Sequence, residues 1–256
     1  KLEIYSTQDQ ANGSFNGGEI LEKKPVGFPS DRGKLKPYSN IFYWAHAWTK
    51  SKKSTIGLHP HKGFEICSFV LKGSINHYDT KQNKWINLKE GDVQIIRSGN
   101  GISHAEELME NSEIFQIWFD PDLSKTLNEM ATYDDYKAED FEIKKNKNGT
   151  TKIIKDDDTV FKMSSEGISI RTYHFKNQLN KASIEIRKDK VHSLFIIDGK
   201  IAGAISRIPK KGSFLSNLSK GGKAIKINLS KREKEISKKI AKDLKKENIF
   251  FAGIDF

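Results

Sequence analysis

The first 120 residues consist of short apolar and aromatic runs that alternate with glycine-containing turns. β-Branched and aromatic side chains of this kind favour strands, because they pack well on a pleated and half-buried surface. The predicted strands are residues 41–48, 64–71, 85–88, 93–96 and 114–119. Short strands at a spacing of roughly 8–12 residues predict a β-barrel or a β-sandwich, so we expect one mainly β domain over residues 1–120.

The pattern becomes less regular after residue 120. We expect a helical or irregular connection over residues 121–138 and a polar hairpin or loop over residues 144–158. Alternating apolar positions predict further strands at residues 167–175, 182–187 and 193–197. So few strands do not close a barrel and leave open sheet edges, so we interpret residues 121–198 as an incomplete second β domain.

The last 58 residues, 199–256, have a different pattern that predicts an α+β segment. Residues 200–208 predict a strand, and the glycine and proline residues of 209–222 predict a loop. Residues 230–246 predict a helix, because Ser230 and Glu233 form a capping box ahead of apolar residues at helical spacing. A short buried strand is expected at residues 249–254.

Charge changes at the same boundary. Residues 1–198 contain 29 Lys or Arg against 28 Asp or Glu, whereas residues 199–256 contain 15 against 5. A basic segment is a feature of nucleic-acid-binding proteins. Only six of the 44 basic residues are Arg, however, and bidentate recognition of phosphate or guanine prefers Arg. We therefore interpret the basic segment as a solvated surface and do not expect a nucleic-acid partner.

The single cysteine and the absence of long apolar runs favour a cytoplasmic protein. No apolar run approaches the length of about 20 residues that a membrane-spanning helix requires, and no signal peptide is visible. Cys67 has no second cysteine with which to pair inside the chain, which fits a reducing compartment. We expect Cys67 to pack as a small apolar residue and expect no membrane association.

Three imidazoles and two carboxylates occur in two short blocks, His59-Pro-His61-Lys-Gly-Phe-Glu65 and His104-Ala-Glu106. In a strand, residues i and i+2 point to the same face, so each pair presents two side chains to one point. Two such pairs in a small barrel predict a site of nitrogen and oxygen ligands, which suits Fe, Mn, Ni, Cu or Zn. The remaining histidines are interpreted as ordinary packed or surface residues: His46, His77, His174 and His192.

The two blocks and the glycines around them resemble the cupin pattern and, more narrowly, the pirin family. The matching stretches are His59-Pro-His-Lys-Gly-Phe-Glu65 and Gly91-Asp-Val-Gln…Gly101-Ile-Ser-His-Ala-Glu106, within a resemblance over about residues 20 to 198. Pirins have two cupin barrels and usually hold iron in the N-terminal barrel. The resemblance implies a metal-binding N-terminal cupin domain at residues 1–120 and a partial second cupin domain at 121–198. The ligands it implies are His59, His61, His104 and Glu106.

Glu65 has two interpretations. The general cupin pattern makes it a metal ligand, whereas the pirin pattern uses Glu106 and leaves Glu65 in a supporting position. We favour Glu106 as the ligand. Metal-bound histidines usually donate a hydrogen bond to a second group, and we expect Glu65 to orient a ligand imidazole in this way.

The resemblance implies an iron-dependent dioxygenase of the quercetinase type, which acts on a small flavonol-like aromatic substrate. Fe(II) is the expected cofactor, and Mn, Ni, Cu and Zn are alternatives. Glu106 would also serve as the catalytic base that removes a hydroxyl proton. The alternative function is a non-catalytic regulatory binding protein that responds to a metal or to its redox state. A second alternative is a fused or truncated gene product.

Residues 199–256 resemble a different family. The stretches Asp198-Gly-Lys-Ile-Ala-Gly-Ala-Ile-Ser-Arg-Ile-Pro209, Asn217-Leu-Ser-Lys-Gly-Gly222 and Gly253-Ile-Asp255 are similar to prokaryotic glutathione synthetase, an ATP-grasp ligase. The similarity implies a substrate-binding Arg207, a glycine-rich phosphate loop at 211–222 and a magnesium ligand at Asp255. The other magnesium ligands of that family would follow Asp255, and its nucleotide-binding lysines have no counterpart here. We therefore expect a non-functional ATP-grasp fragment.

Overall fold

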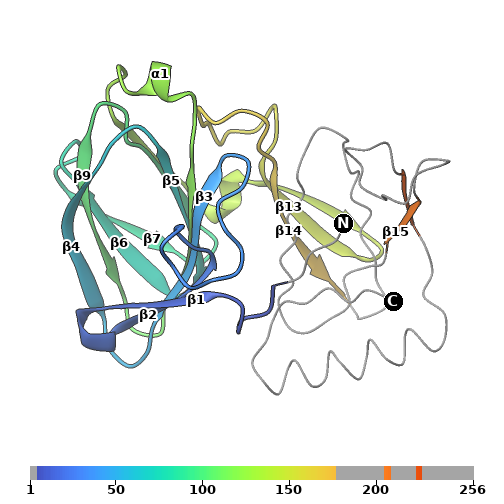
Figure 1. The fold of residues 1–256 in the computed structure, drawn as a ribbon, viewed down its shortest axis with the longest axis horizontal. Helices are drawn as coiled ribbons and strands as arrows, with labels where there is room; N and C mark the ends of the chain where they lie inside the picture. The colour runs from blue at the N-terminus through green and yellow to red at the C-terminus, as the bar shows by residue number, and fades with distance from the viewer. Residues whose placement is uncertain (1–4, 177–204, 209–222, 227–256) are drawn as a thin grey trace. The chain divides into compact units, whose positions relative to one another are not determined.

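A computed structural model of the chain describes residues 5–176, 205–208 and 223–226 (Figure 1). Residues 8–144 and 152–172 form one compact unit, and the other described residues belong to a second unit. The first unit contains two antiparallel sheets that face each other as a β-barrel (Figure 1). This arrangement confirms the mainly β, cupin-like fold expected for the N-terminal region.

The larger sheet has seven strands in the order β1-β2-β3-β10-β5-β8-β11. These strands are β1 Ala11–Phe15, β2 Ile20–Val26, β3 Ile41–Thr49, β5 Glu65–Lys72, β8 Val93–Arg97, β10 Glu113–Phe119 and β11 Thr132–Tyr136. The smaller sheet has four strands in the order β4-β9-β6-β7. These strands are β4 Ser54–His61, β6 Ser74–Asp79, β7 Trp85–Lys89 and β9 Ile102–Leu108.

The helical elements of the described residues are short. They are the α-helix α1 Leu123–Thr126 and the 3₁₀ turns η1 Asn16–Gly18 and η2 Ala138–Asp140. A third sheet is formed by β12 Glu142–Asn146, β13 Gly149–Lys155 and β14 Ile170–Phe175, and a hairpin by β15 Ile205–Ile208 and β16 Lys223–Lys226. Among the described residues, no helix has the length and apolar character needed to cross a membrane.

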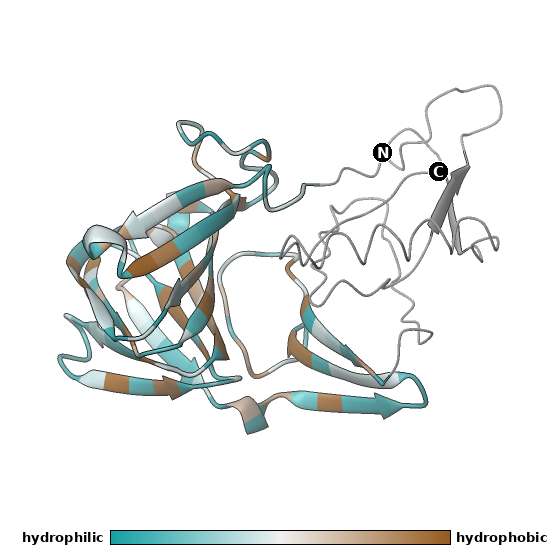
Figure 2. Cartoon of the chain, turned by 90° about the horizontal axis from the view of Figure 1, so that it is seen from below, coloured by the Kyte–Doolittle hydropathy of each residue, from teal (hydrophilic) through white to brown (hydrophobic). Residues whose placement is uncertain are grey.

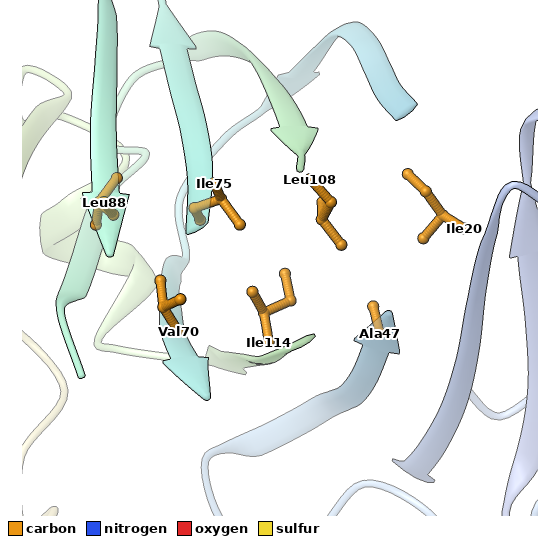
Figure 3. Packing of buried hydrophobic residues seen from close by; sticks show 7 residues of the cluster. All are labelled: Ile20, Ala47, Val70, Ile75, Leu88, Leu108 and Ile114. Atoms are coloured by element: carbon orange, nitrogen blue, oxygen red, sulfur yellow. The ribbon is translucent and has the colours of Figure 1, made fainter. Parts of the chain in front are cut away.

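The core of the barrel is formed by apolar side chains that the two sheets direct toward each other (Figure 3). Hydrophobic and hydrophilic residues both occur along the barrel strands (Figure 2). The cluster in Figure 3 consists of Ile20, Ala47, Val70, Ile75, Leu88, Leu108 and Ile114. Burial of a large aliphatic side chain contributes roughly 1.5–3 kcal/mol, so this cluster is a main source of stability for the barrel.

The five strands predicted over residues 41–119 are confirmed as β3, β5, β7, β8 and β10. The hairpin predicted over 144–158 is confirmed as the β12–β13 turn, and the strand predicted at 167–175 is confirmed as β14. The expectation of a connection at 121–138 is only partly right, because α1 is followed by β11. Tyr133 of β11 lies opposite Ile96 of β8 and is buried, so pairing with β8 makes this polar segment a strand.

Several predicted elements of the second half lie outside the described residues. These are the strands at 182–187, 193–197 and 249–254, the loop at 209–222 and the helix at 230–246. Of the strand predicted at 200–208, the described part is β15, which includes Arg207. Asp255 also lies outside the described residues. The expected boundary at 198 lies outside them too, so the division into domains at 120 and 198 stays a prediction.

Cys67 lies on β5 and is fully buried, as expected for a packed apolar residue. Burial raises the pKa of its thiol well above the usual value, so the reactive thiolate is scarce in the folded protein. The thiol therefore reports on opening of the barrel.

We expect the native protein to react with a maleimide at least about tenfold more slowly than the protein unfolded in denaturant, because the thiol is both buried and protonated. The reaction can be followed by mass spectrometry at pH 8 with equal reagent concentrations. A native rate equal to the unfolded rate would contradict the position of Cys67 in the core.

Candidate metal centre

Strands β4 and β9 are neighbours in the smaller sheet and carry the two histidine blocks. Ile56 lies opposite Glu106 and His59 lies opposite His104, so β4 has one residue more than β9 between these pairs. This extra residue is a β-bulge. Regular alternation from Ile56 would turn Leu58 inward and His59 outward. Leu58 is instead 57% exposed, and His59 lies on the same face as His104.

The bulge brings three imidazoles together. The ring centroids are 4.4 Å apart for His59 and His104, 4.8 Å for His59 and His61, and 4.9 Å for His61 and His104. One ring nitrogen of each residue lies within 4.8 Å of the other two. Three of the four predicted ligands thus form one cluster, with two of them on β4 and one on β9.

The ring nitrogens of this cluster are suited to bind a cation. Nδ1 of His59 lies 2.7 Å from the carbonyl oxygen of Gly57. A carbonyl only accepts hydrogen bonds, so Nδ1 carries the hydrogen and the lone pair of the neutral ring is on Nε2. Nε2 of His61 and both ring nitrogens of His104 are buried and have no hydrogen-bond partner in the described part of the chain. Buried polar atoms normally have partners, so these nitrogens fit a metal site.

Burial keeps the imidazoles of His61 and His104 neutral. Burial, followed by the imidazoles of His104 and His59, lowers the pKa of His61 to about 3. Burial, followed by the imidazoles of His59 and His77, lowers the pKa of His104 to about 2. Protonation would place a positive charge in a poorly solvated site beside other rings. At pH 7 both rings are therefore neutral and keep a lone pair for a cation.

Glu106, the fourth predicted ligand, lies on β9 and is 2% exposed. Its Oε2 accepts a hydrogen bond from Nε2 of Gln116 at 2.7 Å. Its Oε1 accepts hydrogen bonds from Nε2 of Gln94 at 3.1 Å and from Oγ of Ser68 at 3.2 Å. Glu106 does not belong to the group formed by the three clustered histidines, so the complete set of four ligands stays a prediction.

The structure corrects the role of Glu65. This side chain is 1% exposed, and its oxygens accept hydrogen bonds from the backbone N–H groups of Ser164 at 2.5 Å and Ser165 at 2.8 Å. Nε of Arg97 lies 4.0 Å from Oε1. Within the described residues no histidine is among its hydrogen-bond partners. The expectation that Glu65 orients a ligand imidazole is therefore wrong, because backbone groups of a distant segment occupy its carboxylate.

The interpretation of His77 as an ordinary residue overlooks its place in a second group of possible ligand atoms. His77 is fully buried on β6, its Nε2 lies 2.7 Å from Oδ2 of Asp79, and its ring stacks on Tyr133. One ligand atom from each of His77, His104 and Glu106 lies within 4.8 Å of the other two. His77 and Asp79 have the same i, i+2 spacing as the other two pairs. This spacing is the sequence feature that could have singled out His77.

A cavity of about 470 Å³ that is largely open to solvent borders the cluster at His61. Its other lining residues are Pro60, Lys62, Thr80, Gly101, Ile102 and Ser103. This volume lies within the range of small-molecule sites. The rings of Phe64 and Trp118 pack against His61 with centroids 5.3 and 5.2 Å away, so an apolar wall lies beside the cluster.

The segment after His61 is held by α1, which lies at one end of the barrel (Figure 1). Gly63 has a φ of +92°, which residues with a side chain rarely adopt. A Cβ atom at this position would lie only 3.0 Å from Leu123 and 3.1 Å from Leu127. The hydroxyl of Thr126 donates a hydrogen bond to the carbonyl oxygen of Gly63 at 2.8 Å. These contacts fix the end of β4 that carries the histidines.

Two family models match different parts of the sequence. The pirin model matches residues 27–119. The model of the ATP-grasp domain of prokaryotic glutathione synthetase matches residues 151–256, and thus begins before the boundary expected near residue 199. The chain therefore has a pirin-family N-terminal region and a glutathione synthetase ATP-grasp segment at its C-terminus. Both resemblances inferred from the sequence are confirmed, but the pirin match ends at residue 119 and not near residue 198.

Individual relatives match the same two parts. Quercetin 2,3-dioxygenase of Escherichia coli K12 is 39% identical over 69 residues, which cover 26% of this chain and 29% of the relative. Glutathione synthetase of Prochlorococcus marinus subsp. pastoris is 47% identical over 62 residues, which cover 24% of this chain and 20% of the relative. The matched segments thus span less than a third of these curated relatives.

A solved structure supports the fold. The crystal structure of quercetin 2,3-dioxygenase from Acinetobacter baumannii superposes with a TM-score of 0.51 at 17% identity. The superposition covers 64% of this chain and 60% of that chain. At this identity the similarity shows the cupin-like fold alone.

We expect Glu65→Gln to lower the free energy of unfolding by about 2–3 kcal/mol, because the charge-assisted hydrogen bonds to the backbone N–H groups of Ser164 and Ser165 are weakened. Urea denaturation measures the change, and the matched control is Glu110→Gln at an exposed position. Metal content should stay unchanged. Unchanged stability together with loss of metal would instead make Glu65 a ligand.

We expect His59→Ala combined with His104→Ala to abolish stoichiometric metal, because the histidine cluster loses two of its three imidazoles. Elemental analysis of protein purified without chelator measures the content. A metal that binds only the folded state stabilises it by about 2.7 kcal/mol at 100 times its dissociation constant. Fe(II) should therefore raise the melting temperature of the wild type but not of the variant. Stoichiometric metal in the variant would show that other residues are the ligands.

Proposed function

We propose that the pirin-type region is a metal-dependent dioxygenase of the quercetinase type, with His59, His61, His104 and Glu106 as ligands of Fe(II). The observation that carries the proposal is the cluster of three imidazoles beside a cavity of about 470 Å³, in which His61 and His104 have buried nitrogens without a partner in the described residues. Two kinds of donor, imidazole and carboxylate, suit Fe(II) and also Mn, Ni, Cu or Zn.

The residues around His61 suit a flavonol-like aromatic substrate. Phe64 and Trp118 pack beside His61 and provide an apolar surface next to the cluster. Lys62, Thr80 and Ser103 line the cavity and provide polar groups for hydroxyl and carbonyl oxygens. A small number of polar groups in an otherwise apolar site fixes the orientation of a ligand.

Two residues have proposed roles in handling charge and protons. The hydrogen bond from Nδ1 of His59 to the carbonyl of Gly57 keeps Nε2 as the donor atom. Glu106 would accept the proton of a substrate hydroxyl, because a carboxylate near the cluster is a suitable general base. Gln116 and Gln94 hold that carboxylate in place. A bound transition metal supplies a Lewis acid for the hydroxyl oxygen and redox chemistry with O2.

The proposal is tested with protein loaded with Fe(II) under anaerobic conditions and then mixed with quercetin in air. We expect loss of the flavonol absorbance together with O2 uptake, and no change with a flavone that lacks the 3-hydroxyl group. Glu106→Gln should lower kcat by about 10²–10⁴-fold, which is the usual effect of removing a general base.

Absence of absorbance loss in the metal-loaded wild type would reject this substrate class. Full metal binding without turnover, combined with partner binding that follows the redox state of the metal, would instead support a regulatory binding protein. The His59→Ala, His104→Ala variant is the matched control for metal-free background oxidation.

A further inference from the structure

A second group of donor atoms lies next to the histidine cluster. His77 lies on β6 directly opposite Glu106 on β9, and both face the barrel interior with His104. One ligand atom from each of these three residues lies within 4.8 Å of the other two. All three side chains are at most 2% exposed, whereas His59 and His61 are half-buried. The second group is therefore the more deeply buried one.

His77 is oriented as a metal-binding histidine would be. Asp79 is fully buried, and its Oδ1 accepts hydrogen bonds from the backbone N–H groups of Lys81 and Gln82, both at 2.7 Å. Its Oδ2 lies 2.7 Å from Nε2 of His77 and accepts the hydrogen of that nitrogen. Nδ1 of His77 is buried and has no hydrogen-bond partner in the described residues. A carboxylate that fixes one nitrogen and leaves the other free is the usual support of a ligand imidazole.

The ring of His77 is also fixed by stacking. Its centroid lies 4.3 Å from that of Tyr133, and the planes differ by 6°. The hydroxyl of Tyr133 donates a hydrogen bond to Oε1 of Gln94, and Nε2 of Gln94 donates one to Glu106. His77 and Glu106 are thus held by one connected network, which limits the orientations that each side chain can adopt.

In the described residues, the hydrogen-bond partners of Glu106 are all neutral. They are Ser68, Gln94 and Gln116. A buried carboxylate is costly unless it is paired with a cation or coordinates a metal. Hydrogen bonds from hydroxyl and amide groups hold it in place but leave its charge uncompensated. A divalent cation beside Glu106 would compensate that charge.

His104 lies between the two groups and belongs to both. Its ring centroid is 4.4 Å from that of His59 on β4 and 5.7 Å from that of His77 on β6. Both of its nitrogens are buried without a partner in the described residues. A neutral imidazole has its lone pair on only one nitrogen at a time, so His104 can serve one group or the other.

We propose that the barrel holds one divalent transition-metal ion at either of two positions. The outer position uses His59 and His61, the inner position uses His77, and His104 and Glu106 are common to both. The inner donor set of two imidazoles and one carboxylate, His77, His104 and Glu106, suits Zn²⁺ and non-haem Fe²⁺. The inference rests on these donor atoms and does not depend on the oxygenase activity proposed above.

The test uses the full chain in its metal-free form and Co²⁺ as a spectroscopic probe. His59→Ala combined with His61→Ala removes the outer donors, both on the half-buried end of β4. We expect this variant to bind about one Co²⁺ per chain through the inner group. Addition of His77→Gln should weaken binding by at least about tenfold, and addition of Glu106→Gln should do the same. The matched control adds His174→Ala to the His59→Ala, His61→Ala variant, which removes an exposed histidine and should leave Co²⁺ binding unchanged.

Two results would overturn the proposal. The first is failure of the His59→Ala, His61→Ala variant to bind Co²⁺ while the wild type binds it. The second is binding that is unaffected by both His77→Gln and Glu106→Gln. Protection of Cys67 from maleimide confirms that each variant is folded, so a loss of affinity is not mistaken for unfolding. Because Co²⁺ binding is measured without substrate, a lack of quercetin turnover leaves this result unchanged.

Discussion

The metal centre depends on the register of β4 against β9. One extra residue in β4 allows Ile56 to pack on the core and His59, three positions later, to face the same interior. The bulge also supplies the carbonyl of Gly57 that fixes the hydrogen on Nδ1 of His59. Because side chains alternate with a period of two, loss of this single residue would exchange the inner and outer faces of one half of β4. Position and tautomer of His59 thus have the same cause.

The centre contains buried ring nitrogens that no protein group in the described residues satisfies. The unpartnered ring nitrogens belong to His61, His77 and His104, all within the described residues. A buried polar group without a partner costs about 1–3 kcal/mol. The apolar packing of the two sheets (Figure 3) offsets this cost, and a cation that accepts the lone pairs would remove part of it. Metal binding and stability of the fold are therefore linked.

The sequence identifies features that depend on local patterns and misses those that depend on pairing. Five strands between 41 and 119 are apparent because their apolar runs are local, whereas β11 becomes a strand through its pairing with β8. The His59 and His61 pair is apparent from its spacing, but the bulge is visible only in the register with β9. The partners of Glu65 lie 99 and 100 positions away, beyond the reach of any local pattern.

The proposed chemistry lies within the part of the chain that matches pirins, because β4, β6 and β9 all fall inside residues 27–119. It therefore does not depend on the origin of the ATP-grasp segment. The two matched regions are nevertheless connected. Ser164 and Ser165 fall inside the glutathione synthetase match, and their backbone N–H groups bind the carboxylate of Glu65 in the pirin match. A buried carboxylate needs such donors, so residues of the second match satisfy a buried charged group of the first.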